Sequence, residues 1–81
     1  MPRYYFDFRD EDGPAIDEEG VELRDVEAAQ SEAAFAMADA VRDRLRGPVP
    51  RPGEIAIEAR DDIGRVARVR VSIEMQIERK N

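Results

Sequence analysis

A strict alternation of apolar and polar side chains over residues 65–78 constrains this chain more than any other feature. The apolar positions are odd-numbered: Ala67, Val69, Val71, Ile73, Met75 and Ile77. The even-numbered positions from Arg68 to Glu78 are polar. A period of two predicts one β-strand with a buried face and a solvent-exposed face. At about 3.3 Å per residue it would run roughly 45 Å, longer than most strands, so shorter elements must line up along it.

Three further segments show the same period. Residues 3–9 place Tyr4, Phe6 and Phe8 on one face, and such aromatic enrichment favours a strand. Residues 54–60 alternate in the same way, with isoleucines inward. Residues 10–14 and 17–20 combine carboxylates with Gly or Pro, which is typical of turns. Residues 21–23 then predict a short strand that pairs with the first as a loose hairpin.

One helix is expected over residues 26–46. Asp25 is a good N-cap, the segment is rich in alanine and free of Gly and Pro, and Gly47 suits the C′ position. Residues 47–53, GPVPRPG, form a stiff connector. At 100° per residue, Phe35 lies opposite the apolar face. That face holds Val26, Ala33, Ala34, Met37, Val41 and Leu45.

Residues 61–65, DDIGR, predict a tight hairpin. If Asp61 faces Arg65, the loop is a type I turn with Gly64 in the left-handed (αL) region, followed by a bulge. This register sets Ile57 opposite Val69 and Ile55 opposite Val71 on the inner face. On the outer face it sets Glu58 opposite Arg68 as an exposed ion pair.

Together these elements predict an α+β fold of ββαββ type. A single domain over residues 1–81 would contain one antiparallel sheet with the helix packed on one face. The third strand covers the long C-terminal strand only to about Ser72, so the aromatic first strand is the expected partner for the rest. The C-terminal strand would then be central.

Composition excludes most catalytic chemistry. The 81 residues include no cysteine and no histidine, and neither of the two serines has a histidine to activate it. We expect no enzyme activity, no cofactor and no resident metal. The net charge of −6 argues against nucleic acid and anionic membranes as partners. No segment is apolar enough to span a membrane, and a cytoplasmic location is expected.

The acidic turn partly matches a calcium-binding EF-hand loop. Asp10, Asp12, Gly13 and Glu19 fall at positions three, five, six and twelve of that motif. Phe8 occupies the first position and cannot ligate, and a strand precedes the loop where the motif requires a helix. We therefore expect capping carboxylates here, with no calcium affinity tighter than about millimolar.

A row of arginines offers an alternative function. Arg60, Arg65, Arg68 and Arg70 lie on the second hairpin and could contact nucleic acid across an open sheet face. Glutamates on the same face would offset them, and a mixed-charge solvent face is ordinary for an antiparallel sheet. A nucleic-acid-associated module is the alternative interpretation.

The leading interpretation is an interaction or regulatory module that forms a homo-oligomer or binds a protein partner. A domain this small has a thin core and often completes it by pairing, and an open edge strand invites another chain. The candidate interface residues are Tyr5, Phe35, Val66, Met75 and Ile77.

The opening MPRYYFDFRD, the segment DEEGVEL and the hairpin EIAIEARDDIGR resemble a family of short bacterial proteins. Those proteins begin MPRYYF or MPxYYF and reach DEEGxEL before a single helix. The family is catalogued as a domain of unknown function, so the resemblance implies no activity and no site residue. It implies that the chain is a complete protein.

Overall fold

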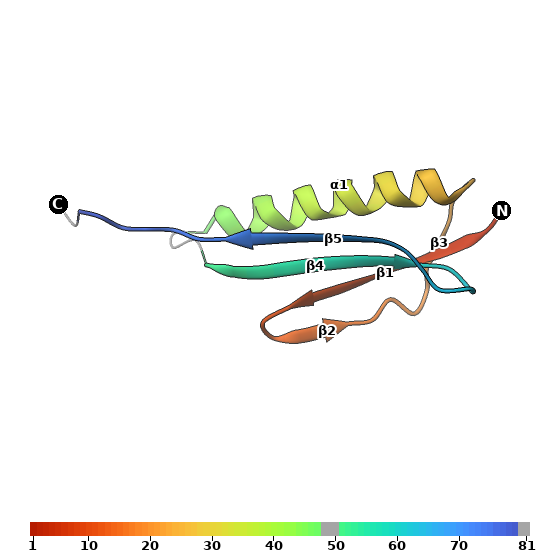
Figure 1. Cartoon of the computed structure of the whole chain (residues 1–81), viewed down its shortest axis with the longest axis horizontal. Coiled ribbons are helices and arrows are strands. Elements are labelled where there is room, and N and C mark those ends of the chain that lie inside the picture. The colour runs from red at the N-terminus through yellow and green to blue at the C-terminus, as the bar shows by residue number, and fades with distance from the viewer. Residues whose placement is uncertain (48–50, 80–81) are drawn as a thin grey trace.

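The computed structural model describes residues 1–47 and 51–79 and confirms an α+β fold of ββαββ type (Figure 1). One antiparallel sheet carries a single helix on one face. In chain order the elements are β1 (Arg3–Asp10), β2 (Gly13–Ala15), β3 (Val21–Glu22), α1 (Val26–Leu45), β4 (Gly53–Arg60) and β5 (Arg65–Ile73).

The strand order is β2-β1-β4-β5, and β3 also pairs with β1. The prediction that the C-terminal strand is central is therefore wrong, because β5 forms an edge. The aromatic strand β1 pairs with β4, where Phe8 faces Ile57. The physical reason lies in β4, which buries Ala56 on the outer face as well as Ile55 and Ile57 on the inner face. A strand buried on both faces belongs in the middle of a sheet.

Residues 55–59 of the β4–β5 hairpin pair in the predicted register, with Ile57 opposite Val69 and Glu58 opposite Arg68. At the turn, Arg65 faces Arg60 instead of the predicted Asp61. The detail of its turn is wrong. Gly64 has a φ of 159°, far from the αL value of about +57°. Instead, the Asp61 carboxylate accepts hydrogen bonds from the backbone N–H groups of Ile63 and Gly64, and the register shift lies between Ala59 and Arg60.

Helix α1 begins as predicted, since the Asp25 carboxylate accepts a 2.8 Å hydrogen bond from the Ala28 N–H. Its buried face differs from the predicted one. Ala29, Ala33, Met37 and Arg44 are buried, whereas Val26, Ala34 and Leu45 are exposed. The helix is thus rotated about its axis relative to its apolar stripe, and it lies over β4 and β5. Residues 48–50 of the predicted connector lie outside the described part of the chain.

The core forms between α1 and the inner face of the sheet. Its centre holds Ala33, Met37, Ile55, Ile57 and Ala59, and Phe6 and Phe8 of β1 pack against it as predicted. Small helix side chains let the helix lie close to the sheet.

Two short strands flank β1 on its other side. β3 pairs with Arg3 and Tyr4, which confirms the predicted strand near residue 21. β2 pairs with Phe8, Arg9 and Asp10, so residues 13–14 belong to a strand and not to the predicted turn. The turn itself is shorter, residues 11–12, where the Asp10 carboxylate accepts a hydrogen bond from the Asp12 N–H.

The predicted strand over residues 65–78 ends early. β5 stops at Ile73, which faces the first residue of β4, Gly53. Residues 74–79 continue beyond the sheet in nearly the same direction (Figure 1), with Met75 and Ile77 exposed by 48% and 71%. We call residues 74–79 the tail.

Candidate functional site

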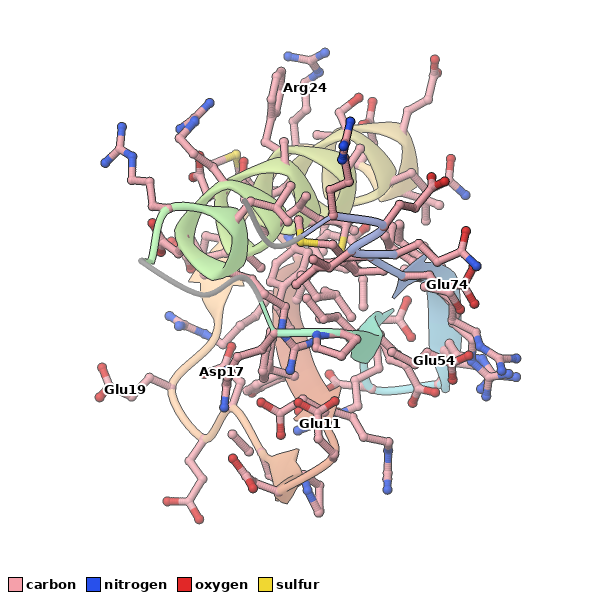
Figure 2. The ribbon with its side chains drawn as sticks, turned by 90° about the vertical axis from the view of Figure 1, so that its left-hand side faces the viewer. Glu11, Asp17, Glu19, Arg24, Glu54 and Glu74 are labelled. Carbon is pink, nitrogen blue, oxygen red and sulfur yellow. The ribbon has the colours of Figure 1, made fainter. Side chains whose placement is uncertain are left out.

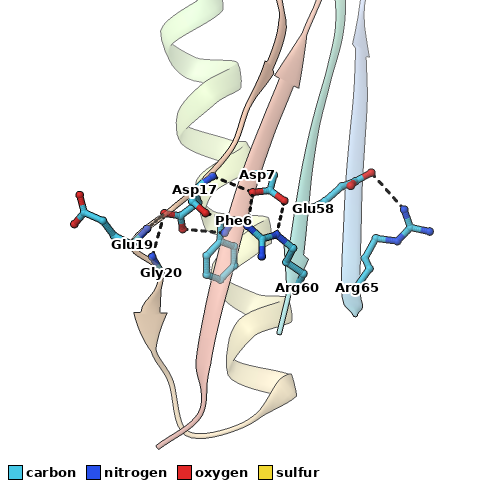
Figure 3. A network of polar contacts seen from close by, with 8 residues as sticks. All are labelled: Phe6, Asp7, Asp17, Glu19, Gly20, Glu58, Arg60 and Arg65. Carbon is cyan, nitrogen blue, oxygen red and sulfur yellow. Dashed lines mark hydrogen bonds and ion pairs between the residues drawn. The ribbon is translucent and has the colours of Figure 1, made fainter. Parts of the chain in front are cut away.

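The two edges of the sheet differ, and Asp17 closes the edge formed by β1. One oxygen of its carboxylate accepts a 3.0 Å hydrogen bond from the Phe6 N–H (Figure 3). The other accepts from the N–H groups of Glu19 and Gly20, both at 3.1 Å. Phe6 lies between the parts of β1 that pair with β3 and β2. The carboxylate therefore replaces a strand neighbour where neither short strand reaches.

On the outer face of the sheet, Arg60 binds both β1 and the loop that contains Asp17 (Figure 3). Its Nε donates to the Asp7 carboxylate at 2.8 Å, and its Nη2 donates to the backbone carbonyl of Asp17 at 3.0 Å. Asp7 also accepts from the Asp17 N–H at 2.9 Å. The guanidinium carbon lies 4.6 Å from the centre of the Tyr5 ring, within cation–π range.

These contacts keep both carboxylates ionised. The hydrogen bond from Arg60 holds the pKa of Asp7 below its usual value, against the opposing effect of burial. Backbone hydrogen bonds from Phe6 and Gly20 lower the pKa of Asp17. A carboxylate with a lowered pKa is a poor proton carrier near neutral pH, so this cluster suits structural work.

The arginine row predicted as a nucleic-acid contact is paired with acidic side chains. The Glu58 carboxylate forms ion pairs with Arg68 and Arg65, with N···O distances of 2.8 and 3.4 Å. Glu54 forms an ion pair with Arg70 at 3.2 Å. The structure brings these three arginines together on β5 and places Arg60 on β4, bound to Asp7. Each of the four thus has a carboxylate partner.

The five candidate interface residues do not form one surface. Tyr5 is half-buried beneath Arg60, and Val66 is half-buried against the core. Phe35 is 68% exposed on the helix. Met75 and Ile77 lie on the exposed tail, so these two share a location.

The edge formed by β5 is open. Among the described residues, β5 has β4 on one side and no strand on the other. Figure 2 shows Glu54 and Glu74 on the side of the molecule that carries β5, opposite Asp17 and Glu19 of the closed edge. Nine residues of edge backbone, followed by the tail, form the surface most suited to bind another strand. We call this surface the open edge.

Sequence reasoning missed a buried arginine. Arg44 is only 8% exposed and forms an ion pair with Glu11, which ties the end of α1 to the β1–β2 turn. It lines a shallow cavity of about 440 Å³ with Phe8, Asp10, Asp43 and Ile55 among its walls. The helical position of Arg44, seven residues after Met37, was the available signal.

Other classes of site receive no support within residues 1–47 and 51–79. Those residues contain no group of three or more acidic side chains placed to hold a metal ion. No helix among them is long and apolar enough to cross a membrane.

The fold and its edges define a class: a small α+β domain with one sheet edge closed by its own chain and the other open. The chain belongs to the family described as Domain of unknown function (DUF6894), whose model matches residues 3–72. No curated protein and no solved structure matches it. The matched range ends just before the tail.

Proposed function

We propose that this protein is a small, non-enzymatic interaction module that binds a second protein strand along the open edge. The carrying observation is the contrast between the two edges. β2, β3 and the Asp17 carboxylate cover β1, whereas no strand of the described residues covers β5, which leads into a tail that keeps the apolar alternation.

The addition of a strand would account for both the uncovered edge of β5 and the apolar alternation of the tail. An added strand would supply backbone hydrogen-bond partners along the uncovered edge of β5, and alternate side-chain positions along that edge would select the side chains of the incoming strand. It would also cover Met75 and Ile77. Support for a cytoplasmic setting comes from the cysteine-free composition, which needs no oxidising compartment.

The nucleic-acid alternative has less support. Arg60, Arg65, Arg68 and Arg70 already contact carboxylates, and the chain carries a net charge of −6. Phosphate would have to displace those carboxylates before any counterion release could favour binding.

Hydrogen exchange combined with sedimentation tests the proposal. We expect the mass to rise with concentration, or on addition of a partner, together with protection of backbone N–H groups in β5 and residues 74–78. Met75→Pro should abolish both changes, because proline cannot donate to a new ladder. Met75 lies outside the sheet, so this change removes no ladder hydrogen bond from the monomer. Association that persists in Met75→Pro without protection of β5 would refute the proposal.

A further inference from the structure

The sequence of β5 and the tail is complementary to itself. In a symmetric antiparallel pair, residues equally far before and after the two-fold axis face each other on the same side of the sheet. With Ser72 on the axis, Arg70 faces Glu74 of the second copy on the outer face. The inner face then pairs apolar residues over residues 67–77: Val71 with Ile73, Val69 with Met75, and Ala67 with Ile77; Arg65 and Arg79 face each other beyond the ends of this run.

Neighbouring registers match over a shorter run than residues 67–77. An axis at Arg70 or at Glu74 places like charges directly opposite each other, which is destabilising. An axis at Val71 pairs Arg68 with Glu74, but it sets Ile77 opposite Arg65 and limits the matched inner face to residues 67–75. An axis at Ile73 pairs Arg68 with Glu78, but it sets Arg79 opposite Ala67 and limits the matched inner face to residues 69–77.

The helix offers a matching surface beside the open edge. The Gln30 side chain donates a 3.2 Å hydrogen bond to the Val66 carbonyl, so this side of α1 faces β5. Asp43 lines the cavity on the β1 side, with Phe8 and Asp10. At 100° per residue, Ala34 and Ala38 lie on the Gln30 side, and both are exposed. Ala34 and Ala38, which the sheet leaves uncovered, thus form an apolar stripe on the side of α1 that faces the open edge.

A second copy would cover this stripe. Its tail would run antiparallel beside β5, and its inner-face Met75 and Ile77 would lie next to Ala34 and Ala38. The helix is parallel to β5 (Figure 1), so the incoming tail follows its length. The same arrangement buries the exposed apolar groups of both tails.

We propose that the partner is a second copy of this chain, joined open edge to open edge with Ser72 on the two-fold axis. This rests on the proposed function and specifies its partner. The result is one continuous sheet with both helices on the same face. In each copy, Arg70 already forms an ion pair with Glu54 of β4, and in the dimer it would also pair with Glu74 of the other copy.

Single cysteines test the register, because the chain has none of its own. Ser72→Cys should form a covalent dimer under mild oxidation, since the two thiols would face each other across adjacent strands. Gln76→Cys is the control: it lies in the same segment, but the two copies of residue 76 would be roughly 25 Å apart. Cross-linking of Gln76→Cys equal to or above that of Ser72→Cys would overturn the register.

Charge reversal tests the ion pairs. Glu74→Arg should raise the dimer Kd about tenfold, because two cross-strand pairs become repulsive. Glu18→Arg makes the same change in net charge on the opposite edge and should leave the Kd within about twofold. Equal effects of the two variants would refute the pairing of Arg70 with Glu74.

The outcomes separate this inference from the function beneath it. Dimers without a Ser72→Cys cross-link refute the register and leave strand addition standing. A monomer at all concentrations that still binds a foreign strand, with β5 protected, refutes the second copy as partner. A monomer whose β5 is never protected refutes both.

Discussion

Gly20 is the residue whose replacement is most directly constrained by its surroundings. A Cβ at this position would lie 2.8 Å from the Tyr4 carbonyl oxygen and 2.9 Å from the Tyr5 ring, and its φ of 69° disfavours other residues. We expect Gly20→Ala to lower the free energy of unfolding by more than about 1 kcal/mol in urea. Glu18→Ala, two residues away, is the control. Equal urea midpoints for Gly20→Ala and Glu18→Ala would mean that Gly20 does not pack against Tyr4 and Tyr5 of β1.

Asp17 supports three backbone N–H groups with one side chain. Asp17→Ala should cost about 2 kcal/mol of unfolding free energy, since hydrogen bonds to a charged group are stronger than neutral ones and Phe6 would lose its acceptor. Chemical denaturation measures this loss, and Glu18→Ala again serves as the control. A loss below about 0.5 kcal/mol would show that water replaces the carboxylate at no cost.

The sequence alone predicts the turn at residues 17–20, but it does not predict the hydrogen bond between the Asp17 carboxylate and the Phe6 N–H. Carboxylates followed by glycine are a local signal, readable from neighbouring residues. The bonds from Asp17 to Phe6 and from Asp7 to Arg60 join residues 11 and 53 positions apart. They depend on which strands are adjacent, and no local pattern specifies that. The sequence singles out Phe35, Met75 and Ile77, which the structure exposes, but it does not show the contacts that close the edge at β1. An interface at Met75 and Ile77 stays a prediction.

At the scale of elements, the closed edge should respond to acid. Asp7 and Asp17 have pKa values below their usual range when folded, so they stabilise the fold above the unfolded value of about 3.9. That contribution is lost as the pH falls below about 4 toward the folded pKa values. We expect Asp17→Asn to be clearly less stable than the wild type at pH 7, and we expect this difference to shrink as the pH falls below about 4, as measured by urea unfolding. A constant difference across this range would contradict the lowered pKa of Asp17.

The strand pairing of the β4–β5 hairpin could be predicted because the apolar alternation selects the observed partners of residues 55–59. The turn residues correctly mark where the chain reverses, but not the conformation of the turn or the partner of Arg65. Strand order does not follow from strand length: the excess length of residues 65–78 predicts a central strand, yet β5 lies at an edge of the sheet. The better signal was composition: β4 reads Ile55-Ala56-Ile57 without a polar break, whereas the outer face of β5 carries Arg68, Arg70 and Ser72. Charged outer faces are typical of edge strands.

For the molecule as a whole, the long alternation has no complete explanation within one chain. The chain measures 55 × 21 × 16 Å and pairs β5 only as far as Ile73, yet the apolar pattern continues to Ile77. A pattern that a monomer leaves in solvent is accounted for if a second copy completes the sheet. On this proposal, a single chain determines the fold, and the apolar alternation beyond Ile73 serves the pairing of two chains.

Phe35 gives the test that separates this assembly from a helix-mediated one. It is 68% exposed and lies on the side of α1 away from the sheet, so edge-to-edge pairing leaves it in solvent. We expect Phe35→Asp to keep the dimer Kd within about twofold in sedimentation equilibrium at micromolar concentrations, while Met75→Pro yields monomers. A helix-face dimer would reverse both results, because a carboxylate placed in a desolvated interface costs several kcal/mol. Circular dichroism of the two variants should match the wild type, since neither side chain belongs to the buried core. Monomeric Phe35→Asp beside dimeric Met75→Pro would move the interface from the open edge to the helix.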